Sequence, residues 1–111
     1  MSLPNLSFDI LVSLASGSKY GYLILLEIEK LHSGQYKPSV GMLYVALQRL
    51  MDGKLIREDA PPVDNKDERR QYYALTSLGA SELQKEAYRR HTLNENTQQR
   101  LKHIFPSPSS I

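Results

Sequence analysis

The sequence predicts a mainly α-helical chain with one small β-hairpin, and three observations carry this prediction. Up to Gly53, three segments repeat apolar residues at helical spacing, and each stops near a glycine. The period then changes, and two short strand-like segments flank a polar stretch. Residues 80–105 contain neither glycine nor proline and have the composition of one long final helix.

Length and composition favour a single soluble domain in the cytoplasm. The chain has 111 residues and a formal net charge of +2, and a domain usually has about 100–200 residues. Without cysteine, the chain can form no disulfide, thiolate metal site or thiol nucleophile. No apolar run approaches the about 20 residues of a membrane span, and no signal peptide is evident.

The first two helices are predicted from the spacing of their apolar residues. In residues 5–15, Phe8, Leu11 and Val12 lie outside the main apolar stripe, so this helix has to be buried on two sides. In so small a chain, we expect the second burying surface to be another subunit. Residues 19–32 repeat apolar residues at i, i+3, i+4 and i+7, which predicts an amphipathic helix.

The third helix has the clearest ends. Ser39 follows Lys37-Pro38 and is a favourable N-cap, and Gly53 stands at the stop position. The stripe predicted to face the core carries Val40, Leu43, Tyr44, Leu47, Leu50 and Met51. The opposite face carries Gly41, Met42, Val45, Gln48, Arg49 and Asp52.

The second half of the chain predicts a hairpin and a long helix. Residues 55–58 and 70–76 are strand-like, and the loop between them is polar and charged. With Thr76 as its N-cap, a helix from Ser77 to about Phe105 is about 43 Å long and overhangs a three-helix core. Its polar middle, residues 92–96, leaves a break in this helix open.

This order of elements is that of a winged helix-turn-helix, and the chain resembles the PadR family of bacterial transcriptional regulators, in its small-subunit branch. The resemblance covers about residues 6–83. It is carried by Tyr20-Gly21-Tyr22, the segment from Ser39 to Leu50, Gly53-Lys54-Leu55-Ile56, the segment from Arg70 to Thr76, and Gly79. Met42 and Val45 stand where the family usually has Thr and Pro, and the acidic pair Asp67-Glu68 replaces part of a Gly- and Arg-rich wing.

The resemblance implies a repressor that binds pseudo-palindromic operator DNA as a homodimer. Residues 1–76 are expected to be the DNA-binding domain, 77–105 the dimerisation helix, and 106–111, rich in Pro and Ser, a disordered tail. Some members of this branch bind flat aromatic molecules, often with a Trp. This chain has no Trp, so a small-molecule effector is an open question.

The candidate DNA-binding residues lie on the third helix and the wing. The N-terminal end of a recognition helix approaches base edges, which points to Ser39, Gly41 and Met42. In the alternative interpretation, Ser39 is only a cap and Gly41 only accommodates packing. The resemblance also implies a phosphate contact for Tyr44, and Arg49 is expected to contact the backbone or solvent.

On the wing, Lys66, Arg69 and Arg70 are candidates for phosphate or minor-groove contacts. The alternative is a solvated loop with internal ion pairs. The candidate dimer interface consists of Phe8, Leu11, Val12, Leu101, Ile104 and Phe105. The alternative is that these six close back on the core of their own subunit.

Two other classes of function compete with a transcriptional regulator. No pair among His32, His91 and His103 has the spacing of a helical metal site, and no phosphate-binding loop is present, so we expect neither an enzyme nor a metal or cofactor. A winged-helix module that binds protein is the stronger rival. The neutral charge of the wing segment and the apolar Met42 and Val45 favour it.

Overall fold

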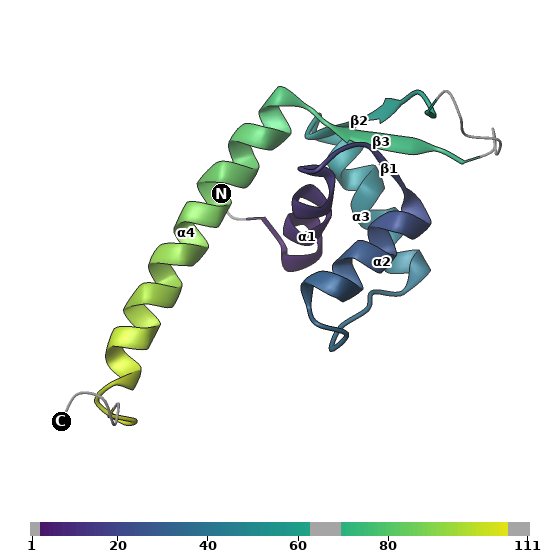
Figure 1. The fold of residues 1–111 in the computed structure, drawn as a ribbon. Helices are drawn as coiled ribbons and strands as arrows, with labels where there is room; N and C mark the ends of the chain where they lie inside the picture. Colours follow the sequence, from purple (N-terminus) through teal and green to yellow (C-terminus); the bar gives the residue numbers. More distant parts are fainter. Residues whose placement is uncertain (1–2, 63–69, 107–111) are drawn as a thin grey trace.

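The computed structural model describes residues 3–62 and 70–106, and within them it has four helices and three short strands (Figure 1). In chain order they are α1 (Asn5–Leu14), β1 (Lys19–Tyr20), α2 (Gly21–Leu31), α3 (Val40–Asp52), β2 (Ile56–Asp59), β3 (Tyr72–Leu75) and α4 (Ser77–Leu101). The predicted mainly α class and winged helix-turn-helix order are confirmed. None of the described helices is long and apolar enough to cross a membrane.

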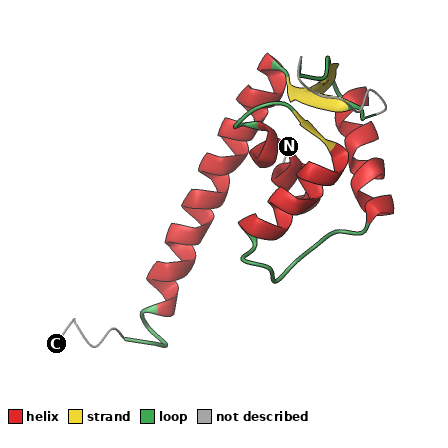
Figure 2. Ribbon diagram, turned by 45° about the vertical axis from the view of Figure 1, so that its right-hand side comes forward, coloured by secondary structure: helices red, strands yellow, loops and turns green. Residues whose placement is uncertain are grey.

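The first three helices and the sheet enclose one hydrophobic core. α1 packs against α2 and α3 on one side and against α4 on another, and β3 also contacts α1 (Figure 2). The core consists of Ile10, Leu11, Leu14, Ile24, Leu25, Ile28, Leu43, Ala46, Leu47, Leu50, Ile56 and Tyr73. The apolar sides of the first three helices therefore meet in one place.

The sheet has one strand more than the predicted hairpin. Lys19 and Tyr20 form β1, which pairs antiparallel with β3, Lys19 opposite Tyr73 and Tyr20 opposite Tyr72. The Lys19 ammonium donates to the Ser13 carbonyl oxygen at 2.6 Å, which holds this buried residue against the end of α1. The expectation that the second helix begins at Lys19 is therefore wrong, and α2 begins at Gly21.

β2 and β3 form the predicted hairpin. Ile56 lies opposite Leu75 and Asp59 opposite Tyr72, so β3 is the central strand, in the order β1-β3-β2. The loop that joins them is described only up to residue 62 and again from residue 70. Lys66 and Arg69 of the predicted wing lie outside the described residues.

α4 is one continuous helix, so the break considered at residues 92–96 is absent. Thr76 caps it as predicted, because its side-chain oxygen accepts from the Gly79 backbone N–H at 2.9 Å. The helix ends at Leu101 and not at Phe105, and the backbone N–H groups of residues 103 and 104 donate to carbonyls three residues back. Pro106 keeps the helix from continuing through Phe105, because a proline disfavours helical geometry in the residue before it.

The long helix makes the chain elongated. Only the first part of α4 lies against α1, and every residue from 91 to 100 is exposed (Figure 1). The described chain measures 60 × 28 × 25 Å, with a radius of gyration of 17.1 Å. A compact chain of this length has about 13 Å. Of the predicted tail, only Pro106 is described, and residues 107–111 lie outside the described residues.

Candidate nucleic-acid interface

The outward face of α3 is the central feature of the candidate site. Leu43, Leu47 and Leu50 are buried in the core, so the opposite side of the helix faces solvent. All six residues predicted for that side are exposed: Gly41, Met42, Val45, Gln48, Arg49 and Asp52. Val40 and Tyr44 are also largely exposed, so their placement on the core stripe is wrong. Both stand at the edge of the stripe, where the helix surface turns away from the core.

At the start of α3, the N-cap hydrogen bond is formed and the space beside Gly41 is open. The Ser39 side-chain oxygen accepts from the Met42 backbone N–H at 3.2 Å, as an N-cap does. At Gly41, an added β-carbon would meet no described atom within 4 Å. Packing among the described residues therefore does not require glycine at position 41. The bare backbone at this position is open to an external partner.

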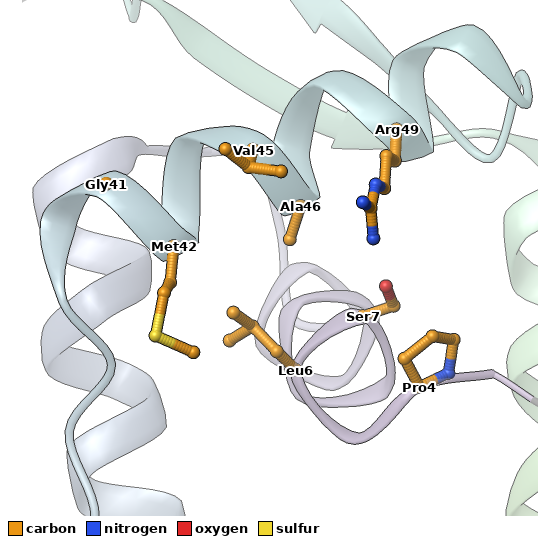
Figure 3. A pocket seen from close by; sticks show the side chains of 8 residues that line it. All are labelled: Pro4, Leu6, Ser7, Gly41, Met42, Val45, Ala46 and Arg49. Atoms are coloured by element: carbon orange, nitrogen blue, oxygen red, sulfur yellow. The ribbon is translucent and has the colours of Figure 1, made fainter.

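A shallow apolar groove runs between α3 and the start of α1 (Figure 3). It has a volume of about 530 Å³ and is lined by Pro4, Leu6, Ser7, Gly41, Met42, Val45, Ala46 and Arg49. Met42 and Leu6 extend towards each other from the two helices, and the Arg49 side chain points from α3 towards Ser7. The groove thus extends the apolar part of the α3 face and has a cation at one end.

On its other edge, α3 meets the N-terminus of α2. A β-carbon on Gly21 would lie 2.5 Å from the Tyr44 hydroxyl oxygen, so this hydroxyl sits at the first residue of α2. The Tyr20 side chain makes no capping hydrogen bond to α2, and the N-terminus of a helix attracts anions through its N–H groups. The Arg70 guanidinium lies 4.3 Å from the centre of the Tyr20 ring.

These groups surround one surface depression, which we call the α2 anion seat and which is lined by Tyr20, Gly21, Tyr22, Tyr44, Arg70, Gln71 and Tyr73. Burial raises the pKa of Tyr73, and the nearby Tyr44 and Glu58 add to the effect. The Tyr73 phenol therefore stays neutral and keeps its proton. A helix N-terminus, phenol hydroxyls and a guanidinium in one depression suit an anionic oxygen.

The base of the wing is fixed by local polar contacts. Arg57 and Asp59 form an ion pair at 3.1 Å on β2. Hydrogen bonds from Ser18 and from Arg57 lower the pKa of Asp59. Of the three predicted wing cations, the structure describes Arg70 alone, and it places Arg70 beside the α2 anion seat.

Comparison with known proteins assigns this architecture to a family. Residues 10–85 match the model of the transcriptional regulator PadR-like family. The chain belongs to the PadR-like family. The resemblance predicted from the sequence is thereby confirmed, and the members of this family are regulators of transcription and not enzymes. No curated protein sequence matches the chain.

Solved structures share the fold of this PadR-like chain. A PadR family regulator from Clostridium difficile R20291 is 23% identical with a TM-score of 0.76, over 88% of this chain and 99% of that one. A transcriptional regulator from Clostridium thermocellum is 23% identical with a TM-score of 0.73, over 85% and 87%. At these identities the likeness shows the fold alone. Bacillus subtilis PadR in complex with operator DNA is 26% identical with a TM-score of 0.62, over 74% of this chain and 46% of that one.

The six predicted interface residues of the PadR-like chain are not equally accessible. Ile104 and Phe105 are 67% and 72% exposed, and Leu101 is partly exposed. Phe8 and Val12 are partly buried, and the Arg90 guanidinium lies 4.0 Å from the centre of the Phe8 ring. Leu11 is fully buried in the core of its own subunit, so it is not available to a partner.

A polar cluster that the sequence reasoning missed joins α4 to the start of the chain. The Glu86 side chain is only 3% exposed, and its carboxylate accepts from the guanidinium groups of Arg89 at 2.6 Å and of Arg90 at 2.8 Å. The Leu3 backbone N–H donates to Glu86 at 3.3 Å, and Arg90 donates to the Leu3 carbonyl at 3.0 Å. The spacing of Glu86 with Arg89 and Arg90 could have predicted the ion pairs. Nothing in the sequence near Glu86 indicates that it is buried against Leu3.

The hydrogen bonds from Arg89, and next from Arg90, lower the pKa of Glu86 to about 2. The same contact with Glu86 raises the pKa of Arg89. The cluster is therefore fully charged near neutral pH. It fixes the direction of α4 relative to α1 and so positions the long helix of the PadR-like fold.

Proposed function

We propose that this PadR-like chain is a repressor that binds operator DNA as a homodimer, with α3 in the major groove. The observation that carries the proposal is the exposed face of α3, which has Arg49 on one edge and the α2 anion seat on the other. A recognition helix in the major groove has a phosphate backbone on each side. The presence of operator DNA in the Bacillus subtilis PadR structure supports the proposal.

In this arrangement the two edges of α3 bind phosphates and its N-terminal end approaches the bases. Tyr44 and Arg70 donate to a phosphate at the α2 anion seat, and Arg49 contacts the opposite backbone. The bare backbone of Gly41 allows α3 to approach the DNA closely, and Ser39 acts as the helix cap. The wing, through Lys66, Arg69 and Arg70, grips the backbone or the minor groove.

The dimer rests on the part of α4 that no other described element of its own subunit covers. The exposed residues 91–100 and the apolar Leu101, Ile104 and Phe105 favour packing against a second α4, because an apolar helix end in water is costly. Phe8 and Val12 on α1 extend this surface. In this proposal residues 1–76 bind DNA, residues 77–105 dimerise, and the protein acts in the cytoplasm, where bacterial operators lie.

The test is an unbiased selection of bound duplexes at stated salt concentrations, followed by footprinting. We expect a pseudo-palindrome with half-sites about one helical turn, or a multiple of it, apart. If each protomer neutralises about four phosphates, the dimer neutralises about eight. At about −0.9 per phosphate, a plot of log K against log salt concentration then has a slope of about −7. Failure to bind any duplex at low salt, including the chain's own promoter, contradicts the proposal, and a single asymmetric half-site contradicts the dimer.

The groove of Figure 3 favours one other function, a winged-helix module that binds a protein through Met42, Val45 and Leu6. The two functions differ in their response to salt. DNA binding through phosphates weakens steeply as salt rises, whereas docking of an apolar protein segment does not. A salt-sensitive mobility shift with duplex decides for DNA.

A further inference from the structure

The centre of the α3 face has little that can form hydrogen bonds with bases. Met42 and Val45 are each 55% exposed, and the exposed Gly41 beside them carries no side chain. Most groups on base edges in the major groove are hydrogen-bond donors or acceptors. The C5-methyl group of thymine is the apolar target that each A·T pair presents there.

Two polar side chains at α3 that could face bases already have partners on the same helix. Gln48, whose amide is of the type that pairs with adenine, donates to the Asp52 carboxylate at 2.9 Å. The Ser39 oxygen accepts from the Met42 backbone N–H, and Arg49 points across the groove towards Ser7 on α1 (Figure 3). The side chains at the centre of the face are therefore left to make apolar contacts.

The charges around this apolar centre fit DNA better than a protein segment. Arg49 lies with Met42 and Val45 on the edge of α3 that faces α1, and Arg70 with the phenol of Tyr44 stands at the other edge. Apolar side chains flanked by cations match a major groove, which has phosphates on both sides and methyl groups on its floor. A purely apolar protein segment carries no charge opposite to that of these flanking cations.

We propose that Met42 and Val45 recognise thymine methyl groups, so that each operator half-site carries thymine under the first turns of α3. This inference rests on the proposed function and names the base chemistry that α3 reads. The branched Val45 side chain is stiff and offers one fixed contact. The flexible Met42 side chain adapts to the neighbouring step.

The experiment uses the full chain and a duplex obtained by the selection described above. Each thymine of the half-site is replaced in turn by deoxyuridine, which lacks only the methyl group. We expect affinity to fall about 4-fold at each of one or two positions, the value for losing one buried methyl group. All other thymine positions should tolerate the replacement.

Two variants assign the effect to its residues. V45A and M42A should each bind the thymine duplex less tightly and lose the penalty for deoxyuridine at one position, because the methyl group then has no partner. R49A serves as the matched control on the same helix: it should weaken both duplexes equally and make the salt slope about one unit shallower. Circular dichroism checks that each variant, altered at an exposed position, remains folded.

The outcomes separate the two levels of the proposal. If the chain binds no duplex, the proposed function fails and this inference fails with it. If it binds duplex but deoxyuridine is tolerated at every position, the proposed function stands and the thymine inference is overturned. The thymine inference is also overturned if V45A and M42A both lose as much affinity as the wild type when deoxyuridine replaces thymine.

Discussion

The hydroxyl oxygen of Tyr44 occupies the space that a β-carbon on Gly21 would need, at 2.5 Å from its position. α3 thus reaches the first residue of α2 through one phenol, and the absence of a side chain at position 21 makes this possible. The contact joins the two helices of the helix-turn-helix at the point where an anion would bind.

Gly21→Ala should therefore weaken DNA binding without unfolding the chain. Tyr44 is 49% exposed, so the tip of its side chain can swing into solvent and leave the α2 anion seat. A charge-assisted hydrogen bond contributes about 1.5–3 kcal/mol, so we expect at least about a 10-fold loss of affinity in a duplex titration. Tyr44→Phe, which removes only the hydroxyl, is the matched control, and it should add little further loss to Gly21→Ala. Normal binding by both variants would remove Tyr44 from the interface.

Gly41→Ala should separate stability from binding. Alanine is favoured over glycine in a helix by about 0.5–1 kcal/mol, and no described atom lies within 4 Å of the new β-carbon. The free energy of unfolding, measured with denaturant, should rise by that amount. Duplex affinity should fall, because the methyl group keeps α3 away from the DNA. A variant that is more stable and binds as tightly as the wild type contradicts a close approach at Gly41.

The lowered pKa of Glu86 predicts that the folded chain loses stability at acidic pH. Its pKa is about 2 in the folded chain, against a usual value of 4.5, so between these values the unfolded chain binds the proton more readily. The contribution of Glu86 is complete above about pH 5 and is lost as pH falls towards 2. Glu86→Gln should lower the Tm at neutral pH and flatten its dependence on pH over that window. Parallel Tm profiles for the two proteins would contradict this role.

Charge at the end of α4 should break the proposed dimer. Ile104→Glu and Phe105→Glu place carboxylates in the exposed apolar surface beyond Leu101, so sedimentation at micromolar concentration should give the monomer mass. Val40→Glu is the matched control, because Val40 is similarly exposed, at 58%, but stands on α3. A wild-type chain that already sediments as a monomer refutes the dimer.

The wing prediction concerns salt as well as affinity. Changing Arg69 and Arg70 together to Ala should weaken duplex binding and reduce the magnitude of the salt slope, because each lost phosphate contact contributes about 0.9 to it. The measurement is a set of titrations at several salt concentrations. Lys54→Ala, outside the wing loop, provides the comparison. An unchanged affinity takes the wing out of the mechanism.

Local signals account for what the sequence predicted well. The ends of α3 follow from the two residues that directly flank it, because Ser39 is its N-cap and Gly53 its C-cap, as predicted. β1 could not be predicted in this way, because its two residues gain strand geometry only from Tyr72 and Tyr73, more than fifty positions later. A pairing so distant leaves no periodic trace in a two-residue segment.

Periodicity predicts the side of a helix on which a residue lies, but not the residue that packs against it. Periodicity showed that Leu11 lies on a second apolar side of α1, but it could not show that its own subunit buries that residue. Likewise, Gln48 was placed correctly on the exposed face of α3, whereas its bond to Asp52 is visible only in the structure. The sequence thus predicted most of the exposed and buried surfaces correctly, but it did not show which partner each single side chain contacts.

The bonds between Leu3 and the Glu86–Arg90 cluster have a mechanical consequence. One bond spans 83 positions of the chain and the other spans 87, so they close a loop that contains every element from α1 to β3. A swing of α4 about Thr76 therefore has to break these bonds or move residue 3 with it. A rotation imposed on the far end of α4 acts first on α1, which packs against both α4 and α3.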